Sequence, residues 1–266
     1  GTGGFGNWNN SIAHYNSAYL QNVISVFMIL FGINFNAYFL LLTRKFKQLF
    51  KIEEIRVYLG VIAVFTTLIA FNVRGCFGSL RESFHHSLFQ VASIITTTGF
   101  SSCDFDLWPT LSKEILVMLM FVGACAGSTG GGMKVSRVLI LAKTARAETR
   151  HLLHPHSVEV MTMDGKRVSS EVIRGTMAFF ICYAAIAVVS ILLVSLDNFG
   201  AETSVTSVFA TLNNIGPGLS LEVGPFGSYA NFSALSKVVL TLDMLLGRLE
   251  LFPVLLLLSP ATWRKH

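Results

Sequence analysis

Three short segments of the sequence combine glycine with small polar residues, the residue types that coordinate a monovalent cation. In chain order they are GTGGFG at 1–6 (the first segment), TTTGF at 96–100 (the second segment) and NNIGPGL at 213–219 (the third segment). Backbone carbonyls and threonine hydroxyls at the end of a short helix can replace the hydration shell of such an ion. Glycine allows the backbone conformations that this arrangement needs, although it also ends many ordinary helices. The chemistry expected here is cation coordination.

The residues expected to form this coordination site lie in all three segments. They are Gly1, Thr2, Gly3, Gly4, Thr96, Thr97, Thr98, Gly99, Asn213, Asn214, Ile215 and Gly216. The two later segments follow apolar stretches at 83–95 and 202–212, which are too short to cross a bilayer. Such stretches form packed core helices or re-entrant half-helices, and irregular backbone at membrane depth is tolerated only in protein or beside a water-filled cavity. Two re-entrant half-helices would imply a pathway through the bilayer.

The composition indicates a membrane protein with several spans. Charged residues make up 13% of the 266 residues, whereas a soluble domain carries about 25%. Five apolar stretches are long enough to cross a bilayer, where roughly 20 residues are needed. They are 20–42, 55–74, 111–142, 172–196 and 234–259. We therefore expect an all-α polytopic membrane protein.

The positions of the charges predict an orientation. Most of the 20 basic residues fall at 44–56, at 134–174 and at the C-terminus, which the positive-inside rule assigns to the cytoplasm. The alternate connections are mainly acidic, a balance that favours cations at the outer surface. The net charge of +5 is therefore an orientation signal and does not predict nucleic-acid binding.

The sequence repeats a unit of span, half-helix, glycine turn and span. Aligning Gly99 with Gly216 at an offset of 117 residues matches the two short apolar stretches and their turns, and Gly4 fits the same place. One unit is complete at 55–142 and another at 172–259. We expect a third unit to be cut at its turn by the first residue, so that the chain is the later part of a longer protein or an incomplete piece of one.

Five glycines interrupt the span at 111–142, in the segment GACAGSTGGGMK at 123–134, which we call the glycine-rich loop. Each interior glycine costs a helix about 1 kcal/mol relative to alanine. A phosphate-binding loop is a weak alternative, because the Gly-Lys-Ser/Thr ending and a preceding strand are missing. Arg248 lies in the last apolar stretch, where an unpaired charge is costly, so we expect it to face protein with Asp243 or Glu250 as partner. A structural ion pair between packed helices is the alternative role.

The long connection before the fourth unit contains VEVMTMDGKRVSSEVI at 158–173, whose Asp164-Gly165 predicts a β-hairpin. His151, His154 and His156 lie nearby without carboxylate or cysteine at ligand spacing, so a solvated loop is favoured over a metal site. Of the four cysteines, only Cys76 and Cys103 could pair outside the membrane, and the sequence leaves that open. No catalytic constellation is present, and we expect no enzyme activity and no bound cofactor.

The ordered set of motifs resembles the Trk/Ktr/HKT superfamily of potassium transporters, within it the bacterial TrkH/TrkG type. The resemblance rests on TTTGF, NNIGPGL, the glycine-rich loop, FGINFNAYF at 31–39 and Arg248, and it covers essentially the whole chain. It implies four repeats around a central pore. The expected parts are the end of the second repeat (1–50), the third repeat with its intramembrane loop (51–142), a cytoplasmic connection (143–171) and the fourth repeat (172–266).

The resemblance also implies function. The expected activity is K⁺ uptake across the bacterial inner membrane through a carbonyl filter, with K⁺ as the transported ion. The gate would comprise Gly123, Gly127, Ser128, Thr129, Gly130, Gly131, Gly132, Lys134 and Arg248. Implied partners are membrane lipid, a ring of nucleotide-binding regulatory subunits of the TrkA kind, and a second copy in a homodimer. A Na⁺-permeable member and an ion-coupled secondary transporter of another solute remain the alternatives.

Overall fold

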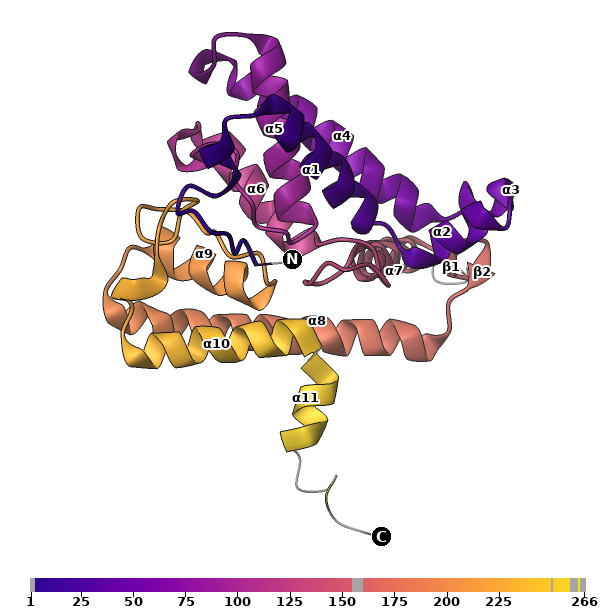
Figure 1. The fold of residues 1–266 in the computed structure, drawn as a ribbon. Helices are drawn as coiled ribbons and strands as arrows, with labels where there is room; N and C mark the ends of the chain where they lie inside the picture. Colours follow the sequence, from indigo (N-terminus) through magenta and orange to yellow (C-terminus); the bar gives the residue numbers. More distant parts are fainter. Residues whose placement is uncertain (1–2, 155–159, 250, 259–262, 264–266) are drawn as a thin grey trace.

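The computed structural model describes residues 3–154, 160–249, 251–258 and 263 and is helical throughout, apart from one short hairpin (Figure 1). The N-terminal part contains α1 (Ala18–Phe31), α2 (Phe35–Leu42) and α3 (Phe46–Leu49). The next unit contains α4 (Glu53–Asn72), α5 (Leu80–Ile95) and α6 (Thr110–Val122), followed by α7 (Val135–Leu153). The last unit contains α8 (Ser170–Val194), α9 (Ala201–Leu212) and α10 (Ala234–Leu249), followed by α11 (Leu251–Leu258).

The order of long helix, short helix and helix occurs twice, as the internal repeat predicted. The two short apolar stretches are the helices α5 and α9. The last seven residues of α5 are all buried, and a helix buried on every side lies inside protein. α5 packs against α4, α1 and α6, while α9 packs against α10, α8 and α6. Both helices are therefore central elements, with other helices packed around them.

Only part of the predicted set of five spans appears as single long helices. Glu53–Asn72 and Ser170–Asp197 are long and apolar enough to cross a membrane alone. The stretch at 20–42 was predicted as one span but forms α1 and α2, which are bent by 90°. Gly32 ends α1, and the side chain of Asn34 caps α2 by accepting a hydrogen bond from the Asn36 amide. Within the described residues, two or three spans therefore meet this criterion.

The other two stretches are also divided. The stretch at 111–142 forms α6 and α7 with the glycine-rich loop between them, as the glycines predicted. The stretch at 234–259 forms α10 and α11, on either side of a residue outside the described ranges. α10 crosses the end of α9 closely: a Cβ atom added to Gly247 would lie 1.8 Å from the carbonyl oxygen of Leu212. In Figure 1, α8 and α10 run side by side, and α11 projects from them.

The hairpin predicted around Asp164-Gly165 is confirmed. β1 (Thr162–Met163) pairs antiparallel with β2 (Lys166–Arg167), with Thr162 opposite Arg167. Asp164 and Gly165 have φ of 55° and 75°, the positive values that a two-residue turn of this kind requires. The hairpin does not project freely, because the Asp164 carboxylate accepts a hydrogen bond of 2.7 Å from the Glu53 amide at the start of α4.

Candidate functional site

The glycine turns of the three predicted segments meet at one place. A Cβ atom added to Gly99 would lie 1.8 Å from the carbonyl oxygen of Ile215 and 2.6 Å from the amide nitrogen of Gly4. A Cβ atom added to Gly216 would lie 2.4 Å from the carbonyl oxygen of Gly3. Gly4, Gly99 and Gly216 have φ of 70°, 80° and 108°, a region that favours glycine. Each turn therefore requires glycine for its backbone angle and for its close neighbours.

The turns are joined by a hydrogen bond and adjoin a cavity. The Gly4 amide donates a 2.8 Å hydrogen bond to the Thr98 carbonyl oxygen, which joins the first segment to the second. A cavity of about 490 Å³ lies beside them and is lined in part by Gly4, Gly99 and Gly216.

The second and third segments have the same backbone hydrogen bonds. The Thr98 amide donates to the carbonyl oxygen of Ser93 at 2.9 Å, and the Ile215 amide donates to that of Ala210 at 2.7 Å. Both pairs are separated by five residues, and the offset between them is the 117 residues of the sequence repeat. The repeat detected in the sequence is thus also a repeat of backbone structure.

Both half-helices end at their turns. Thr97 and Asn214, which follow α5 and α9, have φ of 56° and 57° and leave the helical path at equivalent positions. The last carbonyls of a helix carry partial negative charge, which stabilises a cation nearby. Gly1 and Thr2, also predicted here, lie outside the described residues. The arrangement directs two helix C-termini at the point where the turns converge.

Side chains support the two turns differently. The Thr96 hydroxyl lies 2.8 Å from the Thr98 hydroxyl, so threonines of the second segment contact one another. Asn213 exchanges hydrogen bonds with the Tyr183 hydroxyl, and Asn214 donates to the carbonyl oxygen of Met244 at 3.0 Å. Both asparagine side chains therefore hold the third segment against α8 and α10, and what these turns offer a cation is chiefly backbone.

The glycine-rich loop lies directly against these turns. The Gly131 amide donates a 2.7 Å hydrogen bond to the Thr97 hydroxyl. A Cβ atom added to Gly131 would lie 2.6 Å from the carbonyl oxygen of Asn213, and one added to Gly130 would lie 3.2 Å from that of Thr96. Side chains at these positions would force the loop and the turns apart. The loop therefore touches the turns of both the second and the third segment.

The backbone of the loop turns repeatedly. Gly123, Gly127 and Gly132 have φ of 68°, 68° and 75°, and Lys134 has φ of 77° just before α7 begins. The Lys134 ammonium donates to the carbonyl oxygen of Gly130. These conformations explain why α6 cannot continue into α7, as the glycine content predicted.

The hydroxyl groups of the loop bind backbone atoms. Ser128 donates to the carbonyl oxygen of Cys125 at 2.6 Å, and Thr129 donates to that of Phe31 at 3.3 Å. The Cys125 amide donates to the carbonyl oxygen of Gly32 at 3.1 Å. The loop is thus attached to the break between α1 and α2, which explains why the stretch at 20–42 is not one straight span.

Arg248 contacts the glycine-rich loop. Its guanidinium donates a 3.1 Å hydrogen bond to the carbonyl oxygen of Thr129, and both it and the loop line a cavity of about 60 Å³. The residue is exposed among the described residues, and its guanidinium contacts protein at this cavity. Asp243, one expected partner, is instead buried and accepts a hydrogen bond from Ser190 at 2.8 Å. Glu250, the other, lies outside the described residues.

Two residues that contact the site were not predicted. One carboxylate oxygen of Glu54 accepts hydrogen bonds from the amides of Ala126 and Ser136, at 2.7 and 3.0 Å. The Tyr229 hydroxyl donates to the carbonyl oxygen of Gly216 at 2.8 Å. A carboxylate at the start of a span and a tyrosine in a loop are common surface residues, so only the folded chain identifies them.

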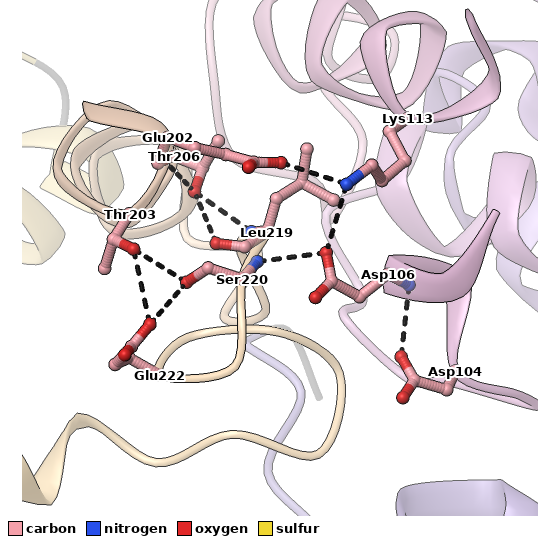
Figure 2. Close-up of polar contacts among 9 residues, drawn as sticks. All are labelled: Asp104, Asp106, Lys113, Glu202, Thr203, Thr206, Leu219, Ser220 and Glu222. Carbon is pink, nitrogen blue, oxygen red and sulfur yellow. Dashed lines mark hydrogen bonds and ion pairs between the residues drawn. The ribbon is translucent and has the colours of Figure 1, made fainter. Parts of the chain in front are cut away.

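Polar contacts join the connections of the two units that the charge pattern assigned to the outer surface (Figure 2). Asp106 accepts a 3.1 Å hydrogen bond from the Ser220 amide, and Lys113 lies 3.2 Å from Glu202 and 3.6 Å from Asp106. Glu222 accepts hydrogen bonds from the hydroxyls of Ser220 and Thr203, on the other side of the same network. Lys113 thus partly neutralises the acidic residues that the sequence places on the outer surface. These contacts also join the two units.

The remaining polar candidates do not form a site. All four cysteines are free, and burial raises the pKa of the Cys103 thiol to about 12. Among the described residues, no group of three or more histidine, cysteine or acidic side chains could hold a metal ion. His156 lies outside those residues.

Comparison with known proteins identifies the family. A family model described as "Cation transport protein", TrkH, matches residues 1–265. The chain belongs to the TrkH family. This is a family of transport proteins and not of enzymes, in agreement with the prediction from the sequence.

Individual members of the TrkH family match over nearly the whole chain. A Trk system potassium uptake protein TrkH from Salmonella typhimurium is 33% identical over 99% of this chain, and a TrkG from Escherichia coli is 34% identical over 98%. The crystal structure of the potassium transporter TrkH from Vibrio parahaemolyticus superposes with a TM-score of 0.89 at 31% identity, covering 98% of this chain. The chain spans about half the length of these relatives, 54% of each sequence and 56% of the solved chain.

Proposed function

We propose that this chain forms part of a potassium uptake pore of the bacterial inner membrane, in which backbone carbonyls of the glycine turns select the ion. The observation that carries the proposal is the convergence of Gly4, Gly99 and Gly216 at one point. Two helix C-termini face that point, where their partial negative charge favours a cation. Relatives of similar sequence are named potassium uptake proteins.

The glycine-rich loop is the proposed gate of this pathway. It touches both complete turns through Gly130 and Gly131, and Arg248 donates to its Thr129 carbonyl. A loop held by backbone hydrogen bonds can be displaced without unfolding a helix, and a guanidinium beside it adds a positive barrier to cations. The open pathway requires the loop to move away from the turns.

Potassium-limited growth provides the first test. The complete protein, expressed in a strain that lacks potassium uptake, is expected to restore growth at low K⁺. Gly99→Ser is expected to weaken discrimination of K⁺ over Na⁺ in a flux assay, because its side chain would meet Ile215 and Gly4. Unchanged discrimination would reject the placement of the filter, and failure of the wild-type protein to restore growth would reject K⁺ uptake.

The two alternatives predict different behaviour. A Na⁺-permeable protein would carry Na⁺ and K⁺ at similar rates in the same assay, whereas glycine in each described turn supports K⁺ selection. A secondary transporter with broken helices has them in inverted pairs. α5 and α9 both meet their turns with the C-terminus, which supports a pore with repeats in one orientation.

A cytoplasmic regulatory ring and a second copy of the protein are the proposed partners. The hairpin at 162–167 supports the regulatory ring as a partner. It lies in the connection between α7 and α8, which the basic residues assign to the cytoplasm. Co-purification of the protein with a nucleotide-binding subunit, and its mass in mild detergent, test the two partners separately. A monomer without a bound subunit at working concentration would contradict both.

A further inference from the structure

Glu54 occupies an unusual position for a carboxylate at the end of a membrane span. Its side chain is 3% exposed. A buried carboxylate is costly unless hydrogen-bond donors surround it. Its donors are two backbone amides, those of Ala126 and Ser136, which bind the same oxygen. These two amides lie near the two ends of the glycine-rich loop.

The two amides hold both ends of the glycine-rich loop to one point on α4. Ala126 lies near the beginning of the loop, and Ser136 is the second residue of α7, directly after it. The first amides of a helix have no partner within the helix, and an anion near them is stabilised. Lys134, the residue before α7, provides no side-chain cap. Glu54 therefore caps α7 from another helix and closes the loop at the same time.

The neighbouring residue connects the same turn of α4 to the hairpin. The Glu53 amide donates to the Asp164 carboxylate, and the Glu53 carboxylate pairs with Lys143 of α7. Lys143 also donates to the carbonyl oxygen of Thr162 in β1, at 2.8 Å. The hairpin, α7 and the first turn of α4 thus form one hydrogen-bonded group around Glu54.

We propose that Glu54 is the positioning residue of the glycine-rich loop, and that it holds the loop against the filter turns by binding both of its ends. Glu53 and Asp164 extend this attachment to the hairpin, so that displacement of the hairpin loosens the loop. The functional consequence rests on the proposed gate, whereas the attachment itself can be measured without transport.

Cys125 reports the position of the loop. Its side chain is fully buried, and its amide binds the α1–α2 break. With Cys76, Cys103 and Cys182 replaced by serine, maleimide labelling of Cys125 in membrane vesicles is followed across a range of pH, which separates the reactivity of the thiol near Glu54 from its accessibility. The accessibility part of the rate measures how often the loop leaves its place. Glu54→Ala is expected to raise this rate at least about tenfold, because hydrogen bonds to a charged group are lost.

Conservative and control variants separate attachment from folding. Glu54→Gln keeps an oxygen acceptor and is expected to raise the rate roughly threefold, since a neutral acceptor binds more weakly. Glu171→Ala removes an exposed carboxylate from the first turn of α8 and is expected to leave the rate unchanged. If Glu54→Ala does not reach the membrane, Glu54→Gln is used in its place. The proposal is overturned if the variant that is used labels at the wild-type rate.

The hairpin connection has its own variant. Asp164→Gly removes the acceptor of the Glu53 amide, while glycine tolerates the positive φ of this turn. It is expected to raise Cys125 labelling severalfold, and to add little in a protein that already carries Glu54→Ala. If the increases in labelling rate caused by the two substitutions multiply in the double variant, the link between hairpin and loop is overturned.

Flux measurements distinguish this proposal from the proposed function. A faster K⁺ leak together with faster labelling in Glu54→Ala supports both. Faster labelling with an unchanged leak supports the attachment and rejects the loop as gate. An unchanged labelling rate rejects the attachment, whatever the flux.

Discussion

The second and third filter segments have the same backbone but different supports. In the second segment, the Ser93 hydroxyl donates to the Phe100 carbonyl oxygen at 2.6 Å, so a side chain of α5 holds the turn. At the position equivalent to Ser93 the third segment has Ala210, which cannot donate. There the Gly216 carbonyl oxygen accepts a hydrogen bond from the hydroxyl of Tyr229, which lies in the connection between α9 and α10.

This difference predicts which movements of the protein displace each turn. The second segment is held locally and contacts the glycine-rich loop through Thr97 and Gly131. The third is held by Tyr183 of α8, by Met244 of α10 and by Tyr229. Movement of the loop should therefore act first on the second segment, and movement of the long helices on the third.

The largest expected effect comes from filling the glycine turns. Gly99→Ala and Gly216→Ala are both expected to reduce K⁺ uptake strongly and to weaken discrimination of K⁺ over Na⁺, because the new methyl group would meet backbone oxygens at 1.8 and 2.4 Å. The loss of thermal stability should be greater for Gly99. Gly60→Ala, on an exposed part of α4 with no atom within 4 Å, is the control and should keep full activity. Wild-type uptake and wild-type discrimination in Gly99→Ala would contradict the closely packed filter.

Tyr229→Phe should alter ion selection through the third segment alone. Freeing the Gly216 carbonyl removes a hydrogen bond with a net value of about 1 kcal/mol, which corresponds to a change in K⁺ over Na⁺ preference of roughly fivefold. Tyr19→Phe, on an exposed part of α1, serves as the control. Equal flux ratios in the two variants would show that Tyr229 does not position the filter.

Ser93→Ala should have a smaller effect on the second segment. It makes this turn resemble the third, where alanine is already present, and leaves the Phe100 carbonyl without its local donor. We expect a change of about twofold to threefold in ion preference, at the low end for one hydrogen bond. A loss of uptake as severe as that of Gly99→Ala would mean that the two segments are not supported independently.

Lys113→Ala should have the smallest effect, although it removes a contact between the two units. Exposed ion pairs contribute less than about 1 kcal/mol and are screened by salt. The Lys113–Glu202 pair, in which Glu202 is half exposed, fits that description. The melting temperature should fall slightly at low salt and match the wild type at high salt. A large fall at both would identify a structural role for the outer network.

Much of the fold could be predicted from the sequence because its signals are local. Glycines at 99 and 216, each after a short apolar stretch, predicted the two half-helices and their turns. Asp164-Gly165 predicted the hairpin, and the glycines at 123–132 predicted the break between α6 and α7. Each prediction depends on residues close together in the chain, where backbone preference decides the structure.

Other features depended on contacts between distant residues and were missed. The bend between α1 and α2, where Gly32 ends one helix and Asn34 caps the next, is also the place where the loop binds the backbone of Phe31 and Gly32 from nearly a hundred residues later in the chain. Asp243 was expected beside Arg248 but faces Ser190, since the two side chains leave α10 on different faces. An apolar window cannot reveal either feature.

The sequence by itself determined the repeat, the glycine turns and the class of membrane transporter, because spacing and composition carry that information. Only the tertiary structure decided how the turns and the loop are held. Glu54, Tyr229 and Asp164 act across 13 to 111 residues of chain, through one or two hydrogen bonds each to backbone atoms. Backbone atoms are the same in every residue, so the sequence does not show which of them a distant side chain will bind.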